Sequence, residues 1–412
     1  MSALEKLSDE IKEHLFMVII PFWRKLRDDE FGGYYGWMDY DLKLDKKAIK
    51  GCILNSRITW FFSNAYMAMR DGYITEEDIR KYKITKEDIL KEARHGYEFL
   101  VNRCLDRANG GIYWSLEYDG TPADTIKHTY NQAFAIYALS SYYDASGDEE
   151  ALKLAKELYG IIEERCTDDL GYMEAFTVDW KPESNEKLSE NGVMADKTMN
   201  TLLHVFEAYT ELYRVSKYEP AGRRLEWILD VIADKIYNPE LHRQEVFFDR
   251  EYNSLIDLHS YGHDIETAWL TDRGVEVLGE KKYFDKLTPI TKDLTGQIYT
   301  VAFDGHSLAD ECEKGVVNEH RIWWVQAETV VGFLNGYFMD ESHDEYLKAA
   351  LAQWDFIKDK LTDKRDGSEW YWEVDASGIP YPDRPIVEQW KCPYHNGRMC
   401  LEVIRRVADH NK

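Results

Sequence analysis

The 412-residue sequence lacks the features that mark several large classes of protein. Its six cysteines are scattered, with no CxxC pair and no dense spacing, which is typical of reduced, mostly buried thiols in an intracellular protein. The apolar run "LFMVII" near the N-terminus is too short to span a bilayer and lies too late for a signal peptide. We therefore expect a cytoplasmic protein.

The sequence also has few basic residues, with 51 Lys and Arg compared with 76 Asp and Glu, which gives a net charge of −25. Nucleic acids and anionic membranes are bound through basic surfaces, so neither is an expected partner. The sequence contains no Gly-rich phosphate loop, no G-x-S-x-G elbow and no dinucleotide fingerprint in a βαβ setting. The ligand is expected to be small or neutral.

No Pro/Ser-rich linker or low-complexity tract divides the chain, and instead one unit recurs: helix, turn, helix and aromatic-rich hairpin. The repeat interval of about 60–70 residues is typical of a repeat fold. The predicted hairpins are "GGYYGWMDYDLKLD", "GGIYWSLEYDGTP", "GYMEAFTVDWKPE", "EVFFDREYNSLI" and "GSEWYWEVDASGIP". We therefore predict a single domain over residues 1–412.

The helices between the hairpins fall into two series. One is amphipathic, as in "ALKLAKELYGIIEE", with starts predicted near Leu4, Glu87, Glu149, Ala221, Lys282 and Asp344. The other is apolar nearly all round, which indicates a doubly buried helix, with starts near Ser56, His128, Thr198, His263, Trp323 and His395. Six outer and six inner helices predict an all-α (α/α)6 barrel with short β-hairpins at its mouth. An open helical solenoid is the alternative, disfavoured by the aromatic hairpins and the lack of distinct capping repeats.

Polar and aromatic residues gather where each inner helix is predicted to begin. If these helices run parallel, their first turns meet at one mouth of the barrel. The residues expected to share a cavity there are Arg57, His128, Asn200, His204, His263, Glu266, Trp324, Glu328 and His395. Several histidines with supporting carboxylates suit general acid–base catalysis near neutral pH. The alternative for any one histidine is a purely structural role.

The stretch "HSYGHDIE" has the spacing of helical zinc ligands, at His259, His263 and Glu266. His259, however, precedes the glycine at which the inner helix is expected to begin, so it need not share a face with His263. Glu266 lies three residues after His263 on one helical face, so its carboxylate is predicted to hold a ring nitrogen of that histidine. We predict that the pair handles a proton and that no metal is needed.

A glycosidase is the weaker enzymatic interpretation. It would need two carboxylates about 5–9.5 Å apart on either side of the scissile bond. Glu266 and Glu328 are the only obvious candidate pair, and each has a partner on its own helix.

Six segments in order, "SRITWFFSNAY", "KHTYNQAFAIYALSSYY", "DKTMNTLLHVFEAYTELY", "HSYGHDIETAWL", "WWVQAE" and "WKCPYHNGRMC", resemble the N-acylglucosamine 2-epimerase superfamily over nearly the whole chain. The resemblance is greatest to its branch that acts on cellobiose. It implies an (α/α)6 barrel with no metal or nucleotide cofactor. It also implies reversible C2 epimerisation of the reducing-end glucose of a β-1,4-linked disaccharide, cellobiose to glucosyl-mannose or lactose to epilactose, through ring opening and an enediolate.

The resemblance also assigns roles to residues. It implies that His263 and His395 form the acid/base pair, with Glu266 beside His263, His204 as a third catalytic histidine and Arg57 near the sugar oxygens. The residues implied to line the sugar site are Asn200, Trp269, Trp324, Glu328, Trp390 and Tyr130. The alternatives are a mannose-type aldose–ketose isomerase, N-acylglucosamine 2-epimerase itself, or a non-catalytic carbohydrate-binding barrel. A monomer or weak homo-oligomer is expected, and the long 71–88 link is predicted to lie away from the mouth.

Overall fold

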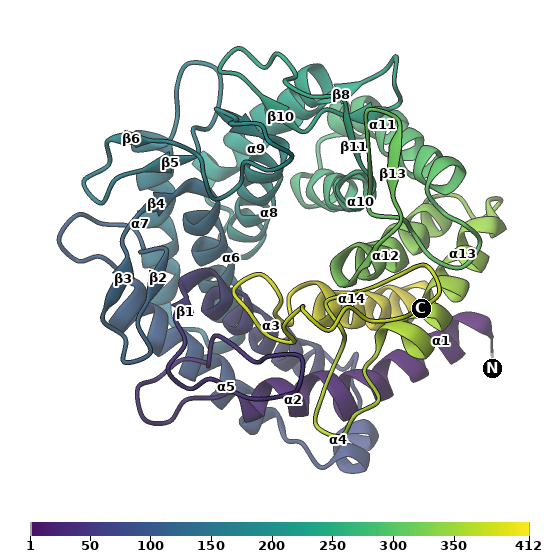
Figure 1. Ribbon diagram of the computed structural model, residues 1–412, viewed down its shortest axis with the longest axis horizontal. Helices are drawn as coiled ribbons and strands as arrows, with labels where there is room; N and C mark the ends of the chain where they lie inside the picture. Colours follow the sequence, from purple (N-terminus) through teal and green to yellow (C-terminus); the bar gives the residue numbers. More distant parts are fainter. Residues whose placement is uncertain (1, 412) are drawn as a thin grey trace.

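The computed structural model describes residues 2–411, and in this range two concentric rings of helices surround one axis (Figure 1). The inner ring is α3 (Cys52–Arg70), α6 (Thr129–Ser146), α8 (Met199–Ser216), α10 (Tyr261–Leu278), α12 (Trp323–Met339) and α14 (His395–His410). Each inner helix packs against the next, and α14 packs against α3. The ring is therefore closed, which confirms the predicted (α/α)6 barrel and rules out the open solenoid.

The outer ring begins with α1 (Ala3–His14), which continues through the π-helical turn η1 (Leu15–Ile19) into α2 (Ile20–Lys25). Its other members are α5 (Lys86–Phe99), α7 (Glu149–Arg165), α9 (Glu219–Val231), α11 (Lys281–Val301) and α13 (Asp344–Phe356). Helices α5, α9 and α13 also end in π-helical turns, η2 (Leu100–Cys104), η3 (Ile232–Ile236) and η4 (Ile357–Leu361). The largest error in a predicted start is at α3, which begins at Cys52 rather than near Ser56.

Local sequence signals explain where several outer helices begin and how the rings pack. Ser2 caps α1 and Thr85 caps α5, each in a reciprocal capping box with the acidic residue three positions later. The outer helices bury only one face, as α9 does with Leu225 and Ile228. The inner helices bury nearly every residue, so the hydrophobic core fills the space between the two rings.

Short strands join neighbouring units at one end of the barrel. Three sheets have three strands: β1 (Lys50–Gly51), β2 (Ser115–Leu116) and β3 (Pro122–Asp124); β4 (Lys127–His128), β5 (Ala175–Phe176) and β6 (Pro182–Glu183); and β11 (Leu258–Ser260), β12 (Glu311–Glu313) and β13 (Val316–Asn318). The other three sheets are strand pairs: β7 (Lys197–Thr198) with β10 (Phe247–Phe248), β8 (Tyr237–Asn238) with β9 (Arg243–Gln244), and β14 (Arg321–Ile322) with β15 (Glu373–Val374). In most of them the strand that leads into an inner helix pairs with the hairpin of the following unit.

Two details of the hairpins differ from the sequence prediction. Three predicted hairpins are closed only by isolated bridges, such as those between Phe248 and Ser254 and between Val374 and Pro380. The regular hairpin β12–β13 lies instead in the stretch before α12, where no hairpin was predicted. Its strands carry no aromatic residue, so the pattern that marked the other hairpins is missing there.

A buried ion pair recurs at the point where the chain turns from an outer helix toward an inner one. A lysine on the strand that enters the inner helix binds an aspartate of the preceding turn in Lys50–Asp28 at 2.5 Å, Lys127–Asp106 at 2.9 Å and Lys197–Asp168 at 2.5 Å. Asp106 also accepts backbone hydrogen bonds from Ala108 and Asn109. These pairs fix where the inner helices begin, and so help to position the site at the mouth.

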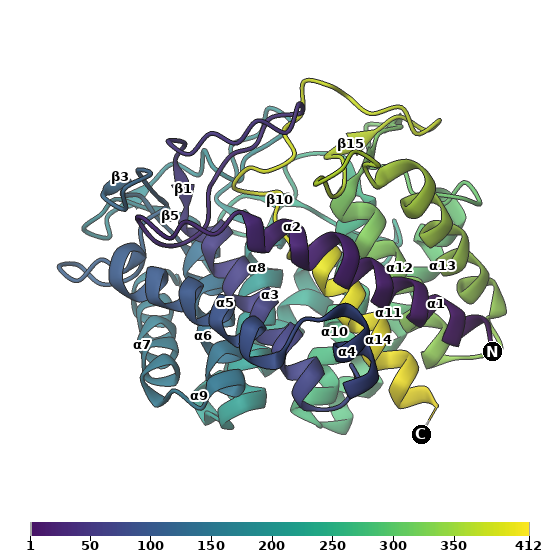
Figure 2. The ribbon, with the colours of Figure 1, turned by 90° about the horizontal axis from the view of Figure 1, so that it is seen from below.

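The long link after α3 contains an extra short helix, α4 (Glu76–Tyr82), where Asp78 lies 3.3 Å from Lys12. Figure 2 shows the hairpins together at one end of the barrel and α4 toward the other end. The link therefore lies away from the mouth, as predicted. Among the helices of residues 2–411, none combines the length and apolar character needed to cross a membrane.

Candidate active site

A cavity of about 440 Å³ opens at the hairpin end of the barrel, where the inner helices begin. Of the eleven residues to which the resemblance assigns a role, nine line it, namely Arg57, Tyr130, Asn200, His204, His263, Glu266, Trp324, Trp390 and His395. Trp269 and Glu328 do not reach the cavity surface. The predicted convergence of inner-helix starts therefore brings most of the chosen side chains together.

His395 is held by a carboxylate behind it. Its Nδ1 lies 2.8 Å from Oε1 of Glu328, and the other oxygen of Glu328 accepts a hydrogen bond from Nε1 of Trp269 at 2.9 Å. With its Nδ1 proton donated to Glu328, His395 presents the lone pair of Nε2 for proton transfer. Burial lowers the pKa of His395 well below its usual value, and the charges of Arg398 and Arg57 add to this effect. The histidine is therefore neutral at neutral pH, with Nε2 free to accept a proton.

Glu328 and Trp269 were expected to line the sugar site, and their positions correct that expectation. Both are buried behind His395, with exposed fractions of 0% and 1%. Glu328 is a positioning residue for His395, and Trp269 in turn orients Glu328. Both project from inner helices toward the barrel axis, but one turn deeper than the residues that reach the cavity.

His263 has a different partner from the one predicted. Its Nδ1 lies 2.7 Å from Oγ of Ser260, the residue immediately before α10, and no hydrogen bond joins it to Glu266. The predicted His263–Glu266 pair is therefore wrong, because Arg398 on α14 attracts the carboxylate of Glu266 across the barrel. Desolvation in the cavity wall lowers the pKa of His263 to about 3, with a smaller effect from His204. His263 is thus also neutral.

The indole ring of Trp324 lies close to both histidines. The ring centroid of Trp324 lies 4.7 Å from that of His263 and 5.5 Å from that of His395. Trp324 is half-buried and lines the cavity. Two neutral imidazoles therefore adjoin one flat apolar surface.

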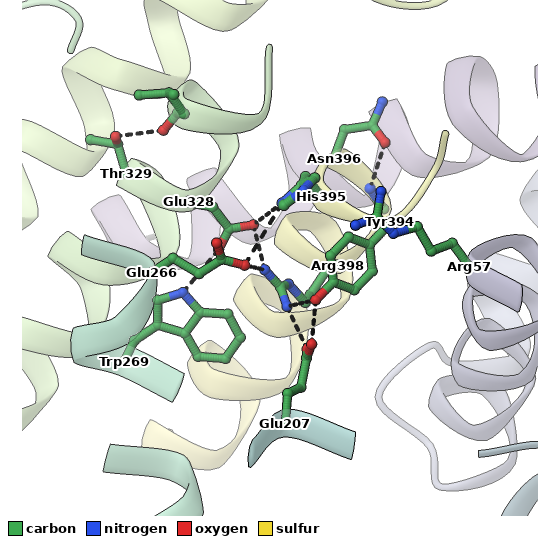
Figure 3. A network of polar contacts seen from close by, with 12 residues as sticks. Arg57, Glu207, Glu266, Trp269, Glu328, Thr329, Tyr394, His395, Asn396 and Arg398 are labelled. Atoms are coloured by element: carbon green, nitrogen blue, oxygen red, sulfur yellow. Dashed lines mark hydrogen bonds and ion pairs between the residues drawn. The ribbon is translucent and has the colours of Figure 1, made fainter. Parts of the chain in front are cut away.

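Arg398 joins three buried carboxylates into one network (Figure 3). It donates to Oε1 of Glu207 at 2.5 Å, to Oε1 of Glu328 at 2.7 Å and to Glu266. One cation therefore faces three acids in a site with almost no solvent exposure. Burial raises the pKa of Glu266 to about 7, and the neighbouring charge of Glu328 acts in the same direction. Glu266 can accordingly hold a proton close to neutral pH.

Glu207 was missed by the sequence analysis. Its carboxylate lies 2.9 Å from Nδ1 of His204 and accepts a hydrogen bond from the hydroxyl of Tyr394 at 2.5 Å. Burial acts to raise the pKa of Glu207, but Arg398 and His204 outweigh it and lower the pKa to about 2. The i,i+3 spacing that wrongly paired His263 with Glu266 correctly describes His204 and Glu207.

Arg57 is a fixed cation in the wall of the same cavity. It donates from Nη2 to the hydroxyl of Tyr130 at 2.8 Å and from Nη1 to the backbone oxygen of Trp390 at 3.3 Å. Its guanidinium lies 4.2 Å from the ring centroid of Phe134, and only 2% of the residue is exposed. Such a preorganised donor is suited to stabilising an oxyanion.

The hairpins and loops add wall residues that no periodic pattern could have identified. They include Glu190, Asn191, Asp310, Glu311, Asn318, His320, Trp372, Glu373 and Arg384. Burial raises the pKa of Asp310 to about 8, and the charges of Glu311 and Glu190 reinforce this. The general signal was present, since the hairpins were predicted to wall the cavity, but the residues themselves were not singled out.

Two other histidines lie outside the cavity. His128 was expected to line it but is fully buried, with Nε2 3.0 Å from Oδ1 of Asn185. It ends the strand before α6 and its side chain turns into the protein interior, which corrects the prediction. His259 lies on β11 with Nε2 2.8 Å from Oδ2 of Asp264, separate from His263 as predicted.

Within residues 2–411, one group of side chains has ligand atoms close enough together to hold a metal ion. It consists of Glu266, Glu328 and His395, whose ligand atoms lie within 4.8 Å of one another. Arg398 already contacts both of these carboxylates and supplies the positive charge that a metal would bring. The cluster is therefore better suited to holding a mobile proton than a cation.

A closed helical barrel with a histidine-lined mouth places the chain among the (α/α)6-barrel sugar epimerases. Within that class the chain belongs to the N-acylglucosamine 2-epimerase (GlcNAc 2-epimerase) family, which it matches over residues 33–396. The resemblance seen in the sequence is thus confirmed, and the chain is an enzyme of this family.

The chain is similar to proteins named for one activity. It is 49% identical to the cellobiose 2-epimerase of Eubacterium cellulosolvens, over 97% of this chain and 98% of that protein. The solved cellobiose 2-epimerase from Bacillus thermoamylovorans has a TM-score of 0.90 and 43% identity, over 98% of this chain and 100% of that one. A sugar epimerase from a ruminal bacterium has a TM-score of 0.92 and 48% identity, over 97% and 99%.

Proposed function

We propose that this enzyme epimerises C2 of the reducing-end glucose in β-1,4-linked disaccharides, converting cellobiose to glucosyl-mannose and lactose to epilactose. The observation that carries the proposal is the pair of neutral histidines, His263 and His395, which both lie beside Trp324 in one cavity. The near-full-length similarity to proteins named cellobiose 2-epimerase supports the choice of substrate.

The chemistry requires two proton-transfer groups. The C2–H bond of an aldose becomes acidic only beside a free aldehyde, so the sugar ring opens first. A base then removes the C2 proton to give a planar enediolate, and an acid returns a proton to the opposite face. His395 and His263 are the proposed pair, and the direction of the reversible reaction decides which of them is the base.

The second histidine must carry a proton when the first one accepts the C2 proton. Glu266, whose pKa is raised to about 7 and whose Oε1 lies 4.0 Å from Nδ1 of His395, is proposed to take the Nδ1 proton when Nε2 accepts the C2 proton, and to return it to Nδ1 when Nε2 donates its proton to C2. Glu328 stabilises the imidazolium of His395 once it forms, because its carboxylate lies 2.8 Å from Nδ1. The proton total of the site is then unchanged after each turnover.

The enediolate carries negative charge on its oxygen atoms. Arg57 and His204 are proposed to stabilise that charge, since both line the cavity and both are held rigidly by Tyr130 and Glu207. Preorganised donors of this kind often contribute about 2.7–4 kcal/mol to a transition state.

A solvent-exchange experiment tests the proposal. The enzyme is incubated in D2O with cellobiose, lactose, mannose or N-acetylglucosamine, each with and without EDTA, and the products are followed by NMR. Deuterium at C2 of a mannose-terminated disaccharide, unaffected by EDTA, is the expected result. A ketose as main product would indicate an aldose–ketose isomerase, and loss of activity with EDTA would indicate a metal. Turnover of N-acetylglucosamine alone would contradict the proposed substrate class.

A further inference from the structure

Ser260, the residue immediately before α10, is the hydrogen-bond partner of His263. Its Oγ lies 2.7 Å from Nδ1 of His263, and within residues 2–411 no other hydrogen bond reaches the imidazole ring. Both residues line the catalytic cavity. Ser260 is therefore placed to decide how the ring of His263 is turned.

The hydroxyl of Ser260 does not cap the helix that it precedes. A serine at this position usually accepts a hydrogen bond from a backbone N–H of the first helical turn. Thr198 does so at the start of α8, where its side chain accepts from the backbone N–H of Thr201. Ser260 is the N-cap residue of α10 and makes no such bond. Its hydroxyl instead binds the side chain of His263, three residues later.

The backbone of Ser260 is held firmly. Ser260 is the last residue of β11 and pairs with Glu311 of β12 in the antiparallel sheet. The backbone N–H of Tyr261 then donates to the backbone oxygen of Asp310 at 3.2 Å. Only 7% of Ser260 is exposed. The hydroxyl thus projects from a rigid segment, as a group that orients a reactive side chain must.

No other contact distinguishes the two orientations of the His263 ring. Rotation by 180° about the last side-chain torsion exchanges Nε2 with a carbon atom, and histidine is roughly two-fold about this bond. The ring of Trp324 lies 4.7 Å away at 46°, but a flipped imidazole keeps the same plane and the same contact. Gln244 binds only the backbone oxygen of His263, at 3.3 Å. The contact with Ser260 therefore sets which edge of the ring faces the cavity.

A hydroxyl suits both states that His263 must adopt. As a base, His263 needs a lone pair on Nε2, so the hydrogen of the neutral ring lies on Nδ1. As an acid, it carries a hydrogen on both nitrogens. In either state Nδ1–H can donate to Oγ of Ser260, while the hydroxyl hydrogen turns toward the cavity that Ser260 lines. One acceptor can thus hold the ring throughout the proton transfer.

Ser260 differs from Glu328, the partner of His395, because it has no charge. The carboxylate of Glu328 lies 2.8 Å from Nδ1 of His395 and forms an ion pair with that ring when it is protonated. Ser260 holds Nδ1 of His263 at a similar distance without an ion pair. Replacing Ser260 should therefore change the orientation and the tautomer of His263 and leave the charge of the site unchanged.

We propose that Ser260 is a positioning residue for His263, whose hydroxyl accepts the Nδ1 hydrogen and so keeps Nε2 facing the sugar for proton transfer at C2. This role rests on the reaction proposed above, in which His263 serves one face of the enediolate. Loss of the hydroxyl should impair only the proton transfer that His263 carries out.

Deuterium uptake at C2 in D2O tests this role in variants that keep one of the two histidines, each supplied with cellobiose and with glucosyl-mannose. In His395→Asn, where His263 remains, adding Ser260→Ala should slow uptake about 3–10-fold, as expected for loss of one neutral hydrogen bond. In His263→Asn, where His395 remains, the same change should alter uptake by less than about twofold, because the two sites are then independent.

Two further variants complete the kinetic test. Ser260→Thr keeps the hydroxyl and should restore uptake in the His395→Asn enzyme, and the exposed Ser377→Ala is the control. Equal slowing by Ser260→Ala in both single-histidine enzymes, or no slowing in His395→Asn, would overturn the proposal.

NMR of the imidazole nitrogens tests the tautomer without substrate. The enzyme is labelled with 15N-histidine, and the signals of His263 are those missing from His263→Asn. At neutral pH the wild type should show a protonated Nδ1 and an unprotonated Nε2, and in Ser260→Ala the hydrogen should move in part to Nε2. Absence of C2 exchange from both single-histidine variants would overturn the proposed reaction and the role of Ser260 with it. Unchanged His263 signals in Ser260→Ala would overturn the role of Ser260 alone.

Discussion

Oε1 of Glu328 lies 2.8 Å from Nδ1 of His395 and, at the same time, 2.7 Å from Nη2 of Arg398. One carboxylate oxygen thus binds both the proposed base and the cation that balances the site. Because a carboxylate in this position fixes the histidine tautomer, the reactive nitrogen of His395 is set by a residue that never touches the cavity.

Glu328→Gln should lower kcat by about 10–100-fold, the range found when a residue that orients a metal-ligating histidine is replaced. KM for cellobiose should change little, since Glu328 does not line the cavity. Steady-state kinetics measure both, with the exposed Glu240→Gln as a control. A change confined to KM would show that Glu328 binds sugar after all.

Glu207→Gln tests whether this carboxylate positions His204. Loss of its charge should reduce kcat and should also lower the pKa of Glu266, because Glu207 now helps to raise it. The alkaline limb of the kcat profile should therefore move to lower pH. A stable variant with reduced kcat but an unshifted profile would assign Glu207 a purely structural role.

Activity should fall as pH rises through about 7, because the proton held by Glu266 is then lost. It should remain high well below pH 6.5, because the pKa of His263 is lowered to about 3 and the base stays unprotonated. The pH dependence of kcat checks both limbs. An acid limb near pH 6.5 would contradict the assignment of a buried neutral base.

The lowered pKa of His263 also affects the stability of the fold. The unfolded chain protonates His263 below pH 6.5 whereas the folded chain resists it down to about pH 3, so its contribution is present above pH 6.5 and is lost as pH falls. Urea unfolding at pH 7.5 and pH 5 should show that His263→Asn loses less stability on acidification than the wild type does. The difference between the two losses of stability should approach about 1.4 kcal/mol for each pH unit below 6.5, the pKa of His263 in the unfolded chain. Equal losses would contradict it.

Arg57→Ala should lower turnover at saturating substrate by about 10²–10³-fold, as expected for loss of an oxyanion donor. Arg80→Ala on α4, exposed and remote from the mouth, serves as the control. Weaker binding with unchanged kcat would show that Arg57 holds the ground-state sugar rather than the enediolate.

The barrel and most of the inner site could be predicted because periodicity and burial are local properties of the sequence. Apolar helices such as α6 and α12 mark the inner ring, and residues at their first turns must converge once the ring closes. The errors arise where distant segments meet. Glu266 turns from His263 to Arg398, which is 132 residues away along the chain, and no spacing rule contains that contact.

The loop residues were beyond prediction for a related reason. Asp310 and Trp372 reach the cavity from hairpins that pair across neighbouring units, so their placement depends on the assembled barrel. Trp269 and Glu328 show a subtler limit. Helical spacing places them on the inner face, but depth along the axis decides that they support His395 instead of touching the ligand.

Proton exchange in the two single-histidine variants tests the central claim most directly. His395→Asn and His263→Asn are each incubated in D2O with cellobiose and, separately, with glucosyl-mannose, and deuterium at C2 is followed by NMR. If the two histidines serve opposite faces, neither variant epimerises, yet one exchanges the C2 proton of cellobiose and the other that of glucosyl-mannose. Conversion of one epimer into the other by either variant within about tenfold of the wild-type rate, a loss of only about 1.4 kcal/mol, would contradict the two-histidine account.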